Sequence, residues 1–329
     1  MKGNVSLTVR LVLLDPMTPS AMEKFSAFLP AGWELATSAA RGEEDQIKAI
    51  SHATYAITGD VPITAAMLRA GAANGLKAVH KWGVGYDNID LATARELKVR
   101  ILRTTGSNAV AVAETALALI MALQRNIVTG HVGIEHGEWL KGRLPAPSMT
   151  LSGKTIGLVG LGYIGKQVAR LVRGFGCTIL YNKPTRLDPA EEHELGVTYV
   201  ERKDLFTRSD VISFHCALSA DTAGMVNRQS LQLMKKNAIL INTARGGLIV
   251  EDDLIEALEN GALRGAGLDV FATEPLPQDH PFRRTRNLVM TPHIGASSAD
   301  AYAPSVKRII GNLECIEAGR EPPALDVLV

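Results

Sequence analysis

The 329-residue sequence predicts an α/β fold with two doubly wound parallel-sheet domains. Strand-like and helix-like segments alternate over the first hundred residues, and the same alternation restarts near residue 155. A long apolar helical stretch separates the two blocks. Strands that alternate with helices predict parallel sheets whose faces are covered by helices. The length accommodates two domains of ordinary size, each with its own core.

Short apolar runs in the first block are typical of buried strands. They are LTVRLVLLD (7–15), WELATS (33–38), YAITGD (55–60), LKAVHKW (76–82) and VRILRT (99–104). The segments between them carry apolar residues at helical spacing, namely AMEKFSAFL (21–29), EEDQIKAI (43–50), ITAAMLRAGA (63–72) and DLATARELK (90–98).

The connection and the second block continue the pattern. Residues 108–128, NAVAVAETALALIMALQRNIV, predict one long helix buried on more than one side, and the Pro-, Gly- and Ser-rich residues 140–154 predict an irregular link. The strands predicted after it are TIGLVG (155–160), CTILY (177–181), VTYV (197–200), DVISFH (210–215), AILINTA (238–244), GAGLDV (265–270) and NLVMT (287–291). A final helix within 296–319 is expected to be broken or delayed by Pro304.

Composition argues against several classes of protein. The 46% hydrophobic and 21% charged residues are typical of a globular chain, and a net charge of +1 gives no global field for nucleic acid or a membrane surface. No apolar run is long enough to cross a bilayer. Cys177, Cys216 and Cys315 are far apart in the sequence, which favours reduced thiols in a cytoplasmic protein. His131 and His136 lie five residues apart, not on one helical face, so no metal site is expected.

The segment GLGYIG, residues 160–165, has the glycine spacing of a dinucleotide-binding turn. It follows the β-branched run TIGLV and precedes a segment with helical spacing, so it joins a strand to a helix. Gly160 permits the tight turn, Gly162 lets a pyrophosphate approach the backbone, and Gly165 lets the helix pack on the strand. The phosphates then face the N–H groups at the helix N-terminus.

The next predicted strand ends in YNKPTR, where an NAD-binding unit carries an acid that binds the ribose hydroxyls. Asn182 occupies that place and is followed by Lys183 and Arg186. An amide does not repel a 2′-phosphate and two cations can pair with one, so the segment favours NADP. Two alternatives stay open. In the first, both cations are solvated in a loop; in the second, Asp188 turns inward to the ribose and restores a preference for NAD.

Three later strands each lead to a residue suited to anion binding or acid–base chemistry. AILINTA runs into Arg245, GAGLDV leads to Glu274, and NLVMTP ends at His293. Ligands of open parallel sheets bind beyond the carboxyl ends of the strands, so these side chains are expected on one side of one sheet. A nicotinamide enzyme acting on a 2-keto acid needs a cation for the substrate, a proton donor and an acid that orients the donor. Taken singly, each residue could instead be a cap, a solvated turn residue or a buried core histidine.

Six segments together resemble signatures of the D-2-hydroxyacid dehydrogenase family over nearly the whole chain. They are KWGVGYDNID (81–90), GSNAVAVAE (106–114), GLVGLGYIG (157–165), INTARGGLIVEDDLIEAL (241–258), GLDVFATEPLP (267–277) and TPHIGA (291–296). The resemblance implies a Rossmann cofactor domain, a flavodoxin-like substrate domain and an active site in the cleft between them. Residues 1–107 with 298–329 are expected to bind substrate. Residues 108–297 are expected to bind the cofactor, with a dimerisation region at about 108–150.

The same resemblance assigns roles to individual residues. Its catalytic set is Arg245, Glu274 and His293. Substrate contacts are expected from Lys81, Val84, Gly85, Arg245 and His293, although for Lys81 a solvated position is the alternative. Cofactor contacts are expected from Gly160, Gly162, Tyr163, Ile164, Gly165, Asn182, Lys183, Arg186, His215, Thr243, Ala244, Asp269 and Gly295, with Asp269 on the nicotinamide carboxamide.

The resemblance implies an NAD(P)-dependent D-2-hydroxyacid dehydrogenase that transfers a hydride between NAD(P)H and a small 2-keto or 2-hydroxy acid. By analogy glyoxylate or hydroxypyruvate is the favoured substrate, and a homodimer is the expected form. The alternative is a dinucleotide-sensing corepressor or scaffold on the same fold, because some relatives keep the three catalytic residues in that role.

Overall fold

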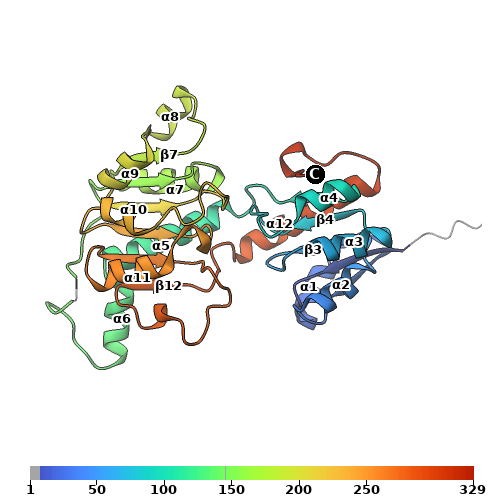
Figure 1. Ribbon diagram of the computed structural model, residues 1–329, viewed down its shortest axis with the longest axis horizontal. Coiled ribbons are helices and arrows are strands. Elements are labelled where there is room, and N and C mark those ends of the chain that lie inside the picture. Colours follow the sequence, from blue (N-terminus) through green and yellow to red (C-terminus); the bar gives the residue numbers. More distant parts are fainter. Residues whose placement is uncertain (1–7, 145) are drawn as a thin grey trace, which may run out of the picture. The chain divides into compact units, whose positions relative to one another are not determined.

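The computed structural model describes residues 8–144 and 146–329, which divide into two compact units. One contains residues 8–107 with Ser298–Val329, and the other contains Asn108–Ser297. Each unit is built on its own parallel sheet, of five strands in the first and seven in the second (Figure 1). The α/β class with two doubly wound sheets is therefore confirmed.

The first unit has the strand order β2-β1-β3-β4-β5 of a flavodoxin-like sheet. The strands are β1 (Val9–Leu13), β2 (Trp33–Thr37), β3 (Tyr55–Thr58), β4 (Ala78–Lys81) and β5 (Arg100–Arg103). One apolar core involves α2 (Glu43–Ile50), α3 (Ala65–Ala73) and α4 (Leu91–Leu97), and a second involves α1 (Pro19–Ser26) and α12 (Ala299–Glu317). Polar caps start three of these helices, since Thr18, Thr64 and Asp90 each accept a first-turn backbone N–H.

The second unit has the order β12-β11-β10-β9-β6-β7-β8, and its chain order reverses between β6 and β9. Its strands are β6 (Thr155–Val159), β7 (Thr178–Asn182), β8 (Val197–Tyr199), β9 (Val211–Phe214), β10 (Ile239–Asn242), β11 (Gly265–Leu268) and β12 (Leu288–Met290). Such a reversal is the switch point at which dinucleotides bind in sheets of this order.

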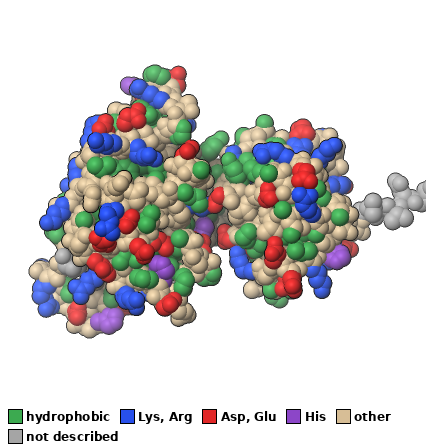
Figure 2. Space-filling model, viewed as in Figure 1, with side chains coloured by type: hydrophobic (Ala, Val, Ile, Leu, Met, Phe, Trp, Pro, Cys, Tyr) green, Lys and Arg blue, Asp and Glu red, His purple; other side chains and the backbone are tan. Residues whose placement is uncertain are grey.

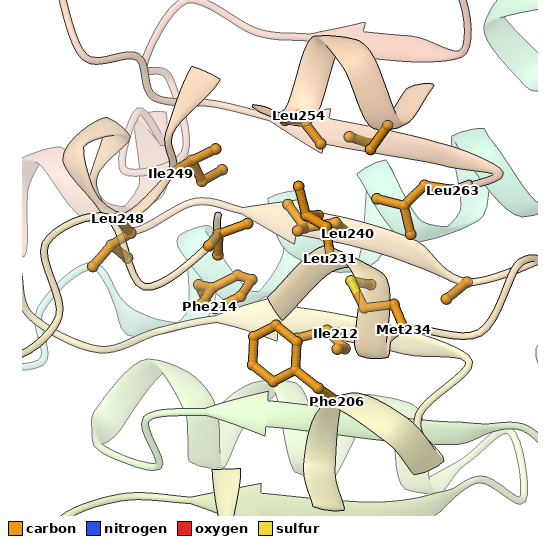
Figure 3. Close-up of a cluster of buried hydrophobic side chains, with 14 of the residues drawn as sticks. Phe206, Ile212, Phe214, Leu231, Met234, Leu240, Leu248, Ile249, Leu254 and Leu263 are labelled. Atoms are coloured by element: carbon orange, nitrogen blue, oxygen red, sulfur yellow. The ribbon is translucent and has the colours of Figure 1, made fainter. Parts of the chain in front are cut away.

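Helices pack on both faces of the second sheet. One core involves α9 (Arg202–Arg208), α10 (Arg228–Leu233) and α11 (Glu251–Glu259); it includes the side chains of Phe206, Leu231 and Leu254 (Figure 3). The other core involves α5 (Ala109–Gln124) and α7 (Tyr163–Arg173). A short helix, α8 (Pro189–Leu195), follows β7.

Two helix predictions were wrong in detail. The helix predicted over 108–128 ends at Gln124, and α6 (Ile127–Glu135) begins after Asn126, whose left-handed φ of 53° turns the chain by 65°. Pro304 does not break or delay the last helix: α12 runs from Ala299 to Glu317 with Pro304 inside it, without the backbone hydrogen bond that a proline cannot donate. Over residues 8–144 and 146–329, no single helix is long and apolar enough to cross a bilayer.

Candidate active site

The glycine turn after β6 has the spacing that a pyrophosphate needs. A Cβ on Gly160, whose φ is 92°, would lie 2.6 Å from the His215 carbonyl carbon, and one on Gly165 would lie 2.3 Å from the Gly160 carbonyl oxygen. A Cβ on Gly162 would meet nothing within 4 Å. Two glycines are therefore required by close packing, and the third faces open space at the N-terminus of α7. No side chain caps that terminus, so its N–H groups can bind an anion.

The residues predicted to select the cofactor behave differently from one another. The Asn182 side chain donates to the Val200 carbonyl at 2.9 Å, and its backbone carbonyl accepts from Gly160. Lys183 has no hydrogen-bond or ion-pair partner among the residues that the structure describes. Arg186 forms two hydrogen bonds of 2.8 Å with Glu192, so its guanidinium is already paired with a carboxylate.

Two buried polar atoms at the carboxyl ends of β9 and β10 lack a hydrogen-bond partner within the described chain. They are Nδ1 of His215, after β9, and Oγ1 of Thr243, after β10. His215 Nε2 lies 2.9 Å from Ser213 Oγ, and burial lowers the pKa of His215 to about 3, so the ring is neutral. Buried polar groups are normally hydrogen-bonded, so these two atoms fit a bound nucleotide.

Arg245 lies on a tight turn at the carboxyl end of β10. The buried Asn242 side chain holds this turn: its amide donates to the Arg245 carbonyl at 2.8 Å, and its oxygen accepts from Ala244 N–H at 3.0 Å. Gly246 packs directly on another segment, because a Cβ there would lie 1.9 Å from the Phe271 carbonyl carbon. The turn that carries Arg245 is thus fixed against the segment that leads to Glu274.

Glu274 and His293 are in direct contact. His293 Nδ1 lies 2.6 Å from Glu274 Oε2, while Glu274 Oε1 accepts from Phe271 N–H at 2.9 Å. Burial alone would raise the pKa of Glu274, but hydrogen bonds from His293 and Phe271 and the charges of His293 and Arg245 hold it below its ordinary value. Glu274 is therefore an ionised acceptor, and the proton on Nδ1 belongs to His293.

His293 has an uncommon backbone conformation that its surroundings enforce. Its φ is 53°, and its N–H donates to the Asp269 carbonyl at 2.8 Å. The Asp269 carboxylate accepts three hydrogen bonds from the same loop: from Thr291 Oγ1 at 2.6 Å, Ile294 N–H at 2.9 Å and Gly295 N–H at 2.8 Å. Left-handed non-glycine residues persist where contacts over-determine them, often at functional sites. Here Asp269 supplies those contacts; its predicted bond to a nicotinamide carboxamide stays a prediction.

The residues predicted to bind substrate from the first unit follow β4. Lys81 is buried and its Nζ donates to the Gly59 carbonyl, so the solvated alternative is wrong. The loop after it is anchored where Gly83 N–H donates to Thr104 Oγ1 at 3.0 Å. Among the described residues, the N–H groups of Val84 and Gly85 donate to no acceptor, and their contact with a substrate carboxylate stays a prediction.

Sequence reasoning missed the residues that hold the catalytic side chains in place. Asn242 is one of them. Asp269 is another, because its bonds to the loop that carries His293 were not predicted. The sequence did mark both residues, because each is a polar residue at the carboxyl end of an apolar strand. Both are buried in the structure. The partners of these residues could not be read from spacing, since Asp269 binds a loop more than twenty residues away.

Comparison with known proteins finds a matching family model and similar reductases. Residues 117–295 match the family described as "D-isomer specific 2-hydroxyacid dehydrogenase, NAD binding domain". The chain is 40% identical over 255 residues to glyoxylate reductase of Thermococcus litoralis, covering 76% of each chain. It is 42% identical over 243 residues to hydroxypyruvate reductase of Thermotoga maritima, covering 73% of this chain and 76% of that one.

Solved structures of the same architecture bind either dinucleotide. NAD-dependent formate dehydrogenase from Staphylococcus aureus in complex with NAD matches with a TM-score of 0.88 and 29% identity, over 98% of this chain and 99% of that one. An acyclic imino acid reductase in complex with NADPH and D-Arg matches with a TM-score of 0.82 and 28% identity, over 98% and 100%.

Proposed function

Since the chain belongs to the D-isomer specific 2-hydroxyacid dehydrogenase family, whose members are NAD-binding oxidoreductases, we propose that it reduces a small 2-keto acid to the D-2-hydroxy acid. Glyoxylate or hydroxypyruvate is the favoured substrate, in line with the activities named for two relatives. The observation that carries the proposal is the 2.6 Å contact between His293 and Glu274, with Arg245 close enough to lower the pKa of Glu274.

Reduction of a carbonyl requires a hydride on carbon and a proton on oxygen. The reduced nicotinamide supplies the hydride, and the π electrons of the carbonyl pass to its oxygen. Because Nδ1 of His293 is bonded to Glu274, the proton for that oxygen comes from Nε2 of the imidazolium. Ionised Glu274 stabilises the imidazolium and fixes its orientation, while Arg245 binds the substrate carboxylate. The neutral imidazole then regains a proton from solvent.

The His293–Glu274 pair also distinguishes this reaction from formate oxidation, the activity named for one of the matched structures. Formate oxidation removes a hydride from carbon and leaves CO₂, so no oxygen takes a proton. An ionised carboxylate that holds a histidine as a proton donor has no such task there. The pair therefore supports a 2-keto acid as the substrate.

Cofactor and substrate contacts are assigned by the same proposal. Gly162, Tyr163 and Ile164 would hold the pyrophosphate, and Lys183 would pair with the 2′-phosphate of NADP, which is the favoured dinucleotide. Thr243, Ala244, His215, Asp269 and Gly295 complete the dinucleotide site. The substrate carboxylate takes the Val84 and Gly85 N–H groups, with Lys81 nearby as a cation.

A homodimer is part of the proposal. Large apolar side chains are exposed on α5, on α6 and just beyond it, at Val110, Ile127, Val128, Val132, Ile134 and Trp139. Such a concentration favours a protein–protein interface. On the face shown in Figure 2, by contrast, cationic and anionic side chains are interspersed, without a basic stripe.

The test is an absorbance assay at 340 nm with NADH or NADPH and glyoxylate, hydroxypyruvate or pyruvate, beside formate with the oxidised dinucleotides. We expect turnover with at least one keto acid, faster with NADPH, and none with formate. Formate turnover alone would refute the proposal. Tight dinucleotide binding without turnover of any substrate would instead favour the sensing role.

A further inference from the structure

A second histidine–carboxylate pair, His280 and Glu251, is bonded to the same segment as Glu274. Glu251, the first residue of α11, has one carboxylate oxygen 2.9 Å from Ala272 N–H and the other 3.3 Å from His280 Nε2. The two side chains are only 17% and 18% exposed. Phe282 N–H donates to Nδ1 of His280 at 3.3 Å, so Nε2 carries the ring proton and donates it to Glu251. The pair is thus an oriented contact in a mostly buried place.

The two carboxylates are held by adjacent peptide groups. Phe271 N–H donates to Glu274 at 2.9 Å, and the next amide, Ala272 N–H, donates to Glu251 at 2.9 Å. The backbone of this segment is also the surface against which Gly246 packs, beside Arg245. A rotation of the Phe271–Ala272 segment would therefore displace the amide that orients Glu274 and loosen the turn that carries Arg245.

We propose that Glu251, braced by His280, is a positioning residue that fixes the Phe271–Ala272 segment and thereby holds Glu274 against His293. Among the described residues, Glu251 bonds to Ala272 N–H and to His280 and not to Arg245, Glu274 or His293, so we take its effect to pass through the backbone. The inference rests on the proposed function for its kinetic consequence, but its structural consequence is measurable on the protein without substrate.

The experiment compares Glu251→Ala, Glu251→Gln and a matched control, Asp252→Ala. Asp252 occupies the same first turn of α11 and is exposed, so the control repeats the loss of one helix-terminal charge. Two readouts are followed: the ring-proton NMR titration of His293, assigned with His293→Gln, and the pH profile of kcat beside the KM for the dinucleotide.

For Glu251→Ala we expect a lower His293 titration midpoint, because Glu274 no longer stabilises the imidazolium as well. The expected kcat falls roughly 10- to 100-fold, as small misplacements of catalytic groups do, with the dinucleotide KM unchanged. Glu251→Gln should recover part of both effects, since its amide oxygen still accepts from Ala272 N–H. Asp252→Ala should match the wild type.

A Glu251→Ala protein with a lower melting temperature but wild-type His293 titration and pH profile would overturn the positioning role. Failure of the wild type to reduce any keto acid would sink the proposed function alone, because the NMR titration still reports on the contact between Glu274 and His293.

Discussion

At the scale of single residues, Arg186 shows that charge alone does not reveal which group a cation pairs with. The sequence predicts two cations for a 2′-phosphate, but Arg186 pairs with Glu192, which also accepts from the Tyr181 hydroxyl at 2.5 Å. Hydrogen bonds from Arg186 and Tyr181 lower the pKa of Glu192 to about 2, so the cluster stays ionised at any ordinary pH. Arg186 thus ties the loop after β7 to α8, which leaves Lys183 as the cation that we propose for the 2′-phosphate.

Substitution of the two cations separates these roles. Lys183→Met should raise the KM for NADPH about tenfold or more and leave the KM for NADH unchanged, because a hydrogen bond to a charged group contributes roughly 1.5–3 kcal/mol. Arg186→Met should lower the melting temperature and leave the ratio of the two KM values as it is. Steady-state kinetics with both dinucleotides and a thermal melt provide the measurements. An unchanged ratio in Lys183→Met would contradict the assignment.

At the scale of elements, the structure of the glycine turn predicts different effects for alanine substitutions at Gly165 and Gly162. Gly165→Ala should destabilise the second unit, because its new methyl group meets the Gly160 carbonyl oxygen. Gly162→Ala should fold normally, since φ is −90° and nothing lies within 4 Å, yet bind dinucleotide poorly because the methyl group occupies the pyrophosphate position. Melting temperatures and fluorescence titrations with NADPH test both. Equal dinucleotide affinity for Gly162→Ala and the wild type would place the pyrophosphate elsewhere.

The strand β4 carries a buried histidine that makes the first unit sensitive to acid. His80 Nδ1 bonds to the Lys81 carbonyl at 2.9 Å, and Asn312 of α12 donates to Nε2 at 3.1 Å. Burial lowers the pKa of His80 to about 4, against an opposing hydrogen bond to Lys81 and the charge of Asp326, while Arg308 adds to the lowering. The folded state therefore keeps His80 neutral at pH values where an unfolded chain protonates it.

The sign of the pH dependence follows. The contribution of neutral His80 to stability is fully present above its ordinary pKa of 6.5 and is lost as the pH falls from there towards about 4. The loss is on the order of 3 kcal/mol in the free energy of unfolding. Urea unfolding of wild type and His80→Gln at pH 7.5 and pH 5 measures the part of this loss that falls above pH 5, about 2 kcal/mol. Equal acid sensitivity of the two proteins would contradict this role of His80.

At the scale of the whole molecule, the alternation of apolar strand-like segments with helical segments was enough to predict both sheets. Buried parallel strands are near-continuous apolar runs, and this chain separates them by helices of ordinary length. The misses occurred where backbone conformation overrode apolar character. Asn126 adopts a left-handed φ inside a run that reads as one helix, and α12 continues through Pro304 although proline lacks the N–H for a helical hydrogen bond.

The catalytic residues of the candidate site were predictable because they follow the ends of strands. Arg245, Glu274 and His293 follow β10, β11 and β12, and parallel strands bring their carboxyl ends together. The supports of these residues were not predictable, because they are contacts between segments far apart in sequence. Glu251 reaches Ala272 across 21 residues, and no periodicity in the sequence marks such a pair.

The expected assembly is also open to measurement. Ile134→Asp places a charge among the exposed apolar side chains of α6, so a dimer built through this region should become a monomer in light scattering after gel filtration. Leu233→Asp, at the exposed end of α10, is the matched control and should leave the mass unchanged. A dimer that survives Ile134→Asp intact would place the interface elsewhere.

The central claim is that His293, held by Glu274, delivers the proton to the substrate oxygen. Its most direct test is kcat for His293→Ala on the best keto acid, measured beside the Kd for the dinucleotide. Loss of the proton donor should lower kcat by roughly 10²- to 10⁴-fold and leave the dinucleotide Kd close to that of the wild type. Turnover retained at the wild-type level in His293→Ala would contradict the account.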